Sequence, residues 1–117
     1  MLQGTGKTAA ARNQALFREV NERMRQSGGA FRIESEDFIC ECAHDDCFEK
    51  IHLSLREYEA IRAHPRRFFV APSDAHFVPE AEIVTHKDER YWIVEKRGDD
   101  GRVAEKLDPR SRSSAAR

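Results

Sequence analysis

The chain has 117 residues, enough for one domain with one modest hydrophobic core. Its 20 basic and 21 acidic residues give a formal net charge of -1, so no global field attracts nucleic acid or an anionic membrane. No run approaches the roughly 20 apolar residues that cross a bilayer, and the N-terminus lacks the apolar block of a secretory signal. We therefore expect a cytoplasmic protein without a membrane segment.

Strong helix formers fill the chain from Ala9 to Gln26, where Leu16, Val20 and Met24 recur at four-residue spacing with Phe17 beside them. This pattern predicts an amphipathic helix that Gly28-Gly29 ends. The narrow apolar stripe of this helix could make one of three contacts. It could cover the domain's own sheet, which we favour, pair with a second copy in a homodimer, or dock on a partner.

The next segment reads as two short strands and a helix. Strands are predicted at 38–40 and at 50–53, where polar and apolar residues alternate. Ser54-Leu55-Arg56-Glu57 has the pattern of a capping box, in which a serine and a glutamate satisfy the free amides at a helix start. A helix is therefore expected from Leu55 to about His64, before Pro65.

The remaining elements are predicted as a strand at 67–71, a loop at 72–76, a turn or short helix at 79–84, a strand at 91–96, a turn at 98–101 and a last short element at 103–107. Together these elements predict a small single α+β domain over 9–107. It has two main helices and a short, mainly antiparallel sheet of three or four strands. A flexible leader is expected at 1–8, and a disordered tail at 108–117.

All three cysteines fall within one stretch, at Cys40, Cys42 and Cys47. In an extended segment alternate side chains share a face, so Cys40 and Cys42 can point one way while Glu41 points opposite. A turn then returns Cys47 toward them. Three thiolates supply three-quarters of a tetrahedral zinc site, which would stabilise a small core. The alternatives are one disulfide with a spare thiol, or buried structural thiols.

A histidine from elsewhere in the chain would complete the zinc site. His76 ranks first because it lies in a proline-flanked loop after a predicted core strand. His52, on the polar side of its strand, and His44, inside the cysteine turn, remain alternatives. His64 and His86 are expected to face solvent.

Several segments resemble a family of small, mostly actinobacterial proteins of unassigned function. The resemblance covers about residues 10 to 108. It is carried by residues 10–23, Phe38-Ile39-Cys40-Glu41-Cys42, Cys47, Glu57-Tyr58-Glu59-Ala60-Ile61-Arg62, Pro65-Arg66-Arg67-Phe68 and Ile93-Val94-Glu95-Lys96, with His76 before Pro79-Glu80. In that family a Pro-Gly-His follows the strand, whereas here Pro72-Ser73-Asp74-Ala75-His76 is longer by two residues. The resemblance implies His76 as the histidine of the site and implies no function.

Three functions are compatible with a zinc site of this kind. The first is a non-catalytic regulatory or interaction module with structural zinc and a protein partner. The second is a redox switch in which oxidation of the cysteines expels zinc. The third is a metal- or cysteine-dependent hydrolase with Glu41 or Asp45 as base, disfavoured because three cysteine ligands blunt the acidity of the metal.

Nucleic-acid binding is a further possibility that we do not favour. Arg62, Arg66 and Arg67 lie around the second predicted helix and its exit, where they could contact phosphate. Because Glu57 and Glu59 are interleaved with them, a solvated, charge-balanced surface is the preferred interpretation.

Overall fold

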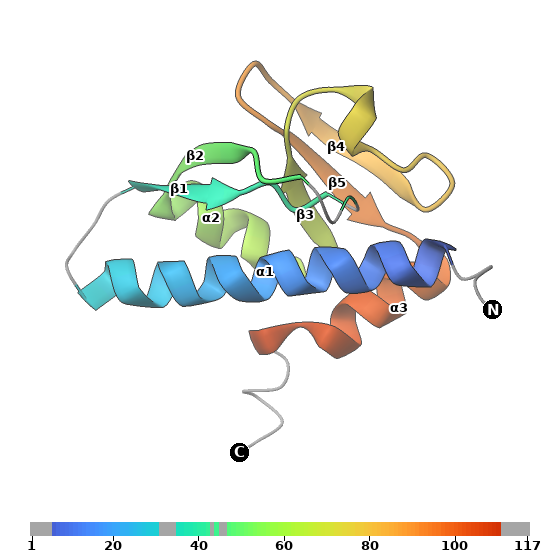
Figure 1. Cartoon of the computed structure of the whole chain (residues 1–117), viewed down its shortest axis with the longest axis horizontal. Helices are drawn as coiled ribbons and strands as arrows, with labels where there is room; N and C mark the ends of the chain where they lie inside the picture. The colour runs from blue at the N-terminus through green and yellow to red at the C-terminus, as the bar shows by residue number, and fades with distance from the viewer. Residues whose placement is uncertain (1–5, 31–34, 43, 45–46, 111–117) are drawn as a thin grey trace.

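The computed structural model describes residues 6–30, 35–42, 44 and 47–110, and the ends predicted to be flexible lie partly outside this range. Within it, Figure 1 shows α1 (Gly6–Ala30), β1 (Ser35–Ile39), β2 (Lys50–Ser54), α2 (Leu55–Arg62), β3 (Arg67–Val70), the 3-10 helix η1 (Asp74–His76), β4 (Glu82–Lys87), β5 (Trp92–Lys96) and α3 (Gly98–Leu107). The α+β class is confirmed.

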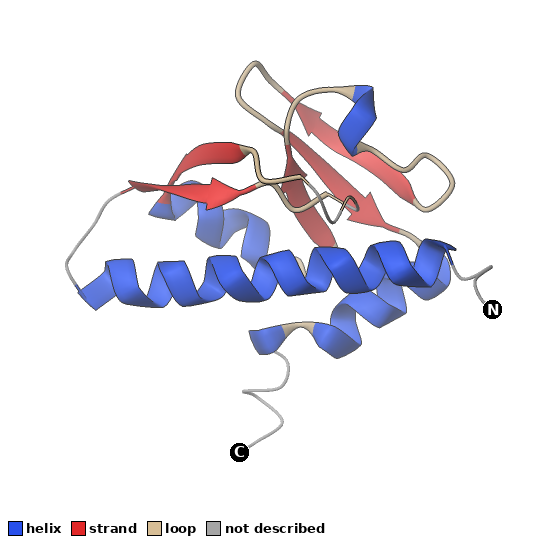
Figure 2. Ribbon diagram, in the orientation of Figure 1, coloured by secondary structure: helices blue, strands red, loops and turns tan. Residues whose placement is uncertain are grey.

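The strands form two antiparallel sheets instead of the single sheet expected. One sheet pairs β1 with β2, and the other has the order β3-β5-β4. The division arises after β1, where the chain changes its hydrogen-bonding partner. The Cys40 amide still donates to the Glu49 carbonyl at 2.8 Å, but the Glu41 amide donates to the Phe69 carbonyl of β3 at 2.9 Å. In Figure 2 both sheets lie on one side of α1 and α3 lies on the other.

The second strand and second helix follow their sequence patterns. In β2, Ile51 and Leu53 are buried while Lys50 is exposed, as alternation requires. The capping box of α2 is confirmed: the Glu57 amide donates to Ser54 Oγ and the Ser54 amide donates to Glu57 Oε1, both at 3.0 Å. The helix ends at Arg62, slightly before the predicted His64, with a cap at Ala63.

Helix α1 is longer than predicted, and its buried face was predicted only in part, since Phe17 is buried and Met24 packs against the core. It runs from Gly6 to Ala30, through Gly28 and Gly29, because glycine costs only about 1 kcal/mol in a helix that is already formed. Leu16 and Val20, expected to face the core, are 57% and 36% exposed.

The buried face of α1 is largely polar instead. Its buried members include Gln14, Arg18, Asn21 and Glu22, which recur at helical spacing. They can be buried because each forms a hydrogen bond with another part of the domain. None of the helices in the described residues is long and apolar enough to span a bilayer.

Two elements of the C-terminal half differ from their predictions. The turn or short helix expected at 79–84 is a turn at 79–81, but β4 then begins at Glu82, whose buried carboxylate is engaged by Lys96 of β5, by Gln14 and by the Val78 amide. The turn expected at 98–101 begins the helix α3. Gly98 leaves β5 with a φ of +57°, which favours glycine, and acidic residues then occupy the positive end of the helix dipole.

Residues 108–110, which were expected to begin a disordered tail, lie within the described part of the chain. Asp108 is buried and accepts a hydrogen bond from Arg62 at 2.5 Å. Arg110 donates to Glu22 and to Glu59, both at 2.8 Å. These ion pairs hold the chain after α3 against α1 and α2, and residues 111–117 lie outside the described part.

Candidate metal centre

Three cysteines and one histidine from two loops converge at one point. The three Sγ atoms of Cys40, Cys42 and Cys47 and a ring nitrogen of His76 all lie within 4.8 Å of one another. His76 Nδ1 is 3.7 Å from both Cys40 Sγ and Cys47 Sγ. In a tetrahedral zinc site with ordinary bond lengths, a sulfur and a nitrogen lie about 3.6 Å apart. The four atoms therefore lie close enough together to hold one metal ion, and two of their separations are near the tetrahedral value.

Local backbone structure presents the three thiols. Cys40 and Cys42 follow β1 in an extended segment, so both side chains point to the same side. The Cys47 amide donates to the His44 carbonyl at 3.2 Å, which closes the turn that brings Cys47 back. Cys40 and Cys42 are fully buried and Cys47 is partly buried.

Glu41 points away from the thiols, as predicted, and into a buried polar cluster under α1. Its carboxylate accepts hydrogen bonds from Arg18 Nη2 at 2.9 Å and from Asn21 Nδ2 at 3.0 Å. Because Arg18 and Glu41 are 1% and 0% exposed, this ion pair is shielded from water. Glu41 is thus an anchor for α1 and not a base for the metal site, while Asp45, the other candidate base, lies outside the described residues.

The candidate ligands are themselves held by neighbouring groups. His76 Nε2, the nitrogen that faces away from the thiols, lies 3.0 Å from Glu49 Oε2. The Ala71 amide donates to Cys40 Sγ at 3.2 Å. A carboxylate behind a metal-binding histidine and amides that donate to thiolates are the usual supports of such ligands.

The thiols do not share negative charge equally. A hydrogen bond from Cys40 is the largest influence on Cys42 and lowers the pKa of Cys42 to about 5, assisted by His76 and the His44 amide, although burial opposes it. The same contact with Cys42, together with burial, raises the pKa of Cys40. The cluster thus holds a thiolate at neutral pH, which favours a bound cation.

The other candidate histidines do not join the cluster. His44 Nε2 lies 2.8 Å from the Ala75 carbonyl oxygen, and its ring centroid is 6.4 Å from that of His76. His52 pairs with Asp37 at 2.7 Å on the exposed side of the β1–β2 hairpin. Of the alternatives for the fourth ligand, the structure brings only His76 to the thiols.

The arginines considered for phosphate binding are engaged by carboxylates. Arg62 is buried between Glu22 and Asp108. Arg66 and Arg67 pair with Glu105 and Glu95 respectively, each at 2.9 Å. The guanidinium groups of these three arginines therefore already pair with carboxylates of the same chain instead of facing a phosphate.

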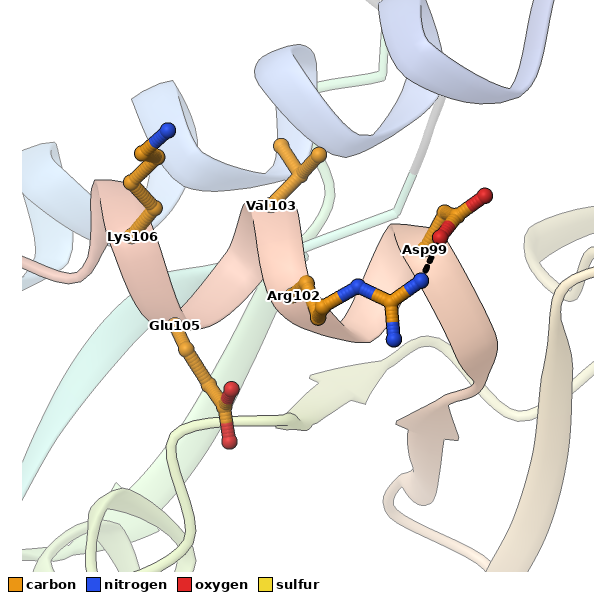
Figure 3. A pocket seen from close by; sticks show the side chains of 5 residues that line it. All are labelled: Asp99, Arg102, Val103, Glu105 and Lys106. Carbon is orange, nitrogen blue, oxygen red and sulfur yellow. Dashed lines mark hydrogen bonds and ion pairs between the residues drawn. The ribbon is translucent and has the colours of Figure 1, made fainter.

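A hollow of about 590 Å³ lies on α3, apart from the cysteine cluster. Figure 3 shows the side chains that line it, which are Asp99, Arg102, Val103, Glu105 and Lys106. Arg102 forms an ion pair with Asp99 within the hollow. Most of these side chains are exposed, and the hollow contains none of the thiol or imidazole groups described above. The cysteine cluster is therefore the candidate metal centre among the described residues.

Comparisons with family models, with curated proteins and with solved structures find no match to this chain. Its function must be argued from the candidate metal centre itself.

Proposed function

We propose that this protein is a small zinc-binding, non-catalytic module that regulates or binds another protein. Zn²⁺ would be held by Cys40, Cys42, Cys47 and His76. The observation that carries the proposal is the convergence of three sulfur atoms and one imidazole nitrogen within 4.8 Å. Clustered thiols without a disulfide framework also support a reducing cytoplasmic location.

The donor set favours zinc over other common metals. Thiolate and imidazole are the ligands of structural zinc, whereas magnesium and calcium take oxygen donors. The separation of 3.7 Å between His76 Nδ1 and two of the sulfur atoms agrees with the tetrahedral value of about 3.6 Å.

A structural role is supported by how the site is closed. Four protein ligands leave no coordination position for water or substrate. The ligands also come from segments that belong to different sheets, since Cys40, Cys42 and Cys47 lie between β1 and β2 whereas His76 follows β3. A metal bound there would join the two sheets, so its binding free energy would contribute to folding.

Elemental analysis of purified variants tests the proposal. We expect about one zinc per chain in the wild type, and loss of zinc together with stability in Cys42→Ser and His76→Ala. His44→Ala is the matched control, because it removes a neighbouring histidine that does not join the cluster. Equal zinc content and stability in His76→Ala and His44→Ala would overturn the proposal.

A thiol switch is the second candidate function, and the partial exposure of Cys47 favours it. Hydrogen peroxide would oxidise two thiolates to a disulfide and be reduced to two hydroxide ions, with release of zinc. A chromogenic chelator would report the release. If zinc stays bound at peroxide concentrations that oxidise ordinary exposed thiols, the site is only structural.

A further inference from the structure

One side of α1 carries apolar side chains that the described part of the chain leaves open. Leu16 is 57% and Val20 is 36% exposed, although both are large hydrophobic residues. They lie one helical turn apart on the same face, and Met24, one turn further on, is partly buried because it packs against the core of the domain. In Figure 1 this helix runs along the length of the molecule.

A groove beside these residues contains two charges of opposite sign. It has a volume of about 510 Å³ and is lined by Val20, Arg23, Met24 and Glu36 of β1. No ion pair among the described residues engages Arg23 or Glu36. Glu36 Oε2 is shielded from solvent and has no hydrogen-bond partner in the described part of the chain.

An unpartnered carboxylate oxygen beside open apolar surface indicates contact with another molecule. Leaving such an oxygen buried without a donor costs free energy that a neighbouring cation would offset. In a twofold interface the same patch faces itself, so each patch must supply both members of any ion pair. The groove does so, because Arg23 and Glu36 line it together.

We propose that Leu16, Val20, Arg23, Met24 and Glu36, here called the α1 flank, form a homodimer interface. The occupant is the α1 flank of a second copy. The apolar side chains of the two helices pack against each other, and Arg23 of each copy pairs with Glu36 of the other. This interface does not depend on the proposed zinc function.

Sedimentation of the full chain from about 1 µM to about 1 mM tests the proposal, because that range spans weak and moderate affinities. We expect a monomer–dimer equilibrium that Leu16→Glu and Val20→Glu shift to monomer. Ile83→Glu is the matched control, since Ile83 is a 42% exposed apolar residue on β4, and it should leave the dimer unchanged. Circular dichroism checks that each variant is folded.

Charge reversal distinguishes a second copy from any other partner. Arg23→Glu and Glu36→Arg each place like charges opposite one another twice in a homodimer, so each should raise the dissociation constant at least about tenfold. A mixture of the two variants restores both ion pairs and should form heterodimers. The proposal is overturned by a chain that stays monomeric throughout, by a dimer that tolerates Leu16→Glu, or by variants that fail to associate when mixed.

Discussion

Replacing Glu41 with alanine should strongly destabilise the fold. The Glu41 carboxylate accepts hydrogen bonds from Arg18 at 2.9 Å and from Asn21 at 3.0 Å, and all three side chains are buried. Without this carboxylate, the Arg18 guanidinium keeps two hydrogen-bond acceptors among the described residues, the backbone carbonyls of Pro65 and Arg67. Removing one partner of a buried ion pair costs about 3–5 kcal/mol, so we predict a loss of that size in the free energy of unfolding.

Urea unfolding followed by the fluorescence of Trp92, the single tryptophan, would measure this loss. The informative comparison is the double variant Arg18→Met/Glu41→Leu. It removes both charges and fills the space with apolar atoms, so it should recover most of the stability that either single change loses. Zinc content of each variant, measured without urea, separates an effect on α1 from loss of the metal.

The reasoning fails if Glu41→Ala costs less than about 1 kcal/mol, the ordinary effect of a point mutation. It also fails if the double variant is no more stable than Glu41→Ala, because the penalty would then not come from an uncompensated Arg18.

Three further predictions follow from the contacts around the site and the helices. Glu49→Gln should weaken zinc binding about 10–100-fold in chelator competition, because the carboxylate lies 3.0 Å from His76 Nε2; an unchanged affinity would exclude an orienting role. Although burial raises the pKa of Glu22, hydrogen bonds led by that from Arg110 lower it to about 2. The carboxylate therefore stabilises the fold above its unfolded pKa, and its contribution is lost as pH falls toward 2. The difference in unfolding free energy between wild type and Glu22→Gln should shrink from about pH 5 to pH 2, and a constant difference would contradict this. Ser54→Ala should cost about 1 kcal/mol in thermal unfolding, because the Glu57 amide loses its acceptor; an unchanged melting temperature would show that the cap is dispensable.

The candidate site was predictable because its chemistry is local. Alternation in an extended segment placed Cys40 and Cys42 together and Glu41 opposite, which the structure confirms. The position of His76 depended on where the loop after β3 returns, and spacing alone could not exclude His44 or His52. The β1–β2 hairpin excludes His52 by directing it to the exposed side, where it bonds Asp37.

The sequence misled where charged residues are buried. The apolar repeat of Leu16 and Val20 predicted the inner face of α1, but Gln14, Arg18 and Asn21 occupy it because their partners come from distant strands and loops. Those polar residues also recur at helical spacing, which is the one feature of the sequence that could have indicated their shared face. This spacing does not show that the face is buried, because an ordinary solvated helix face has the same spacing.

Strand β4 and the first half of helix α3 were not predicted. Glu82 begins β4 in a buried position, where its carboxylate is engaged by Lys96, by Gln14 of α1 and by the Val78 amide. Gly98 and the two aspartates after it have the composition of a turn, yet acidic residues also suit the first turn of a helix. A tertiary ion pair therefore accounts for β4, whereas the start of α3 was ambiguous in the local sequence.

The most direct test of the proposed zinc site is X-ray absorption at the zinc edge of the purified protein. The account predicts a first shell of three sulfur atoms at about 2.3 Å and one nitrogen atom at about 2.0 Å. The nitrogen should be kept in His44→Ala, whereas His76→Ala should lose most of its zinc and show no nitrogen at about 2.0 Å in any zinc that it retains. A shell made only of oxygen and nitrogen, or a nitrogen that persists in His76→Ala, would contradict it.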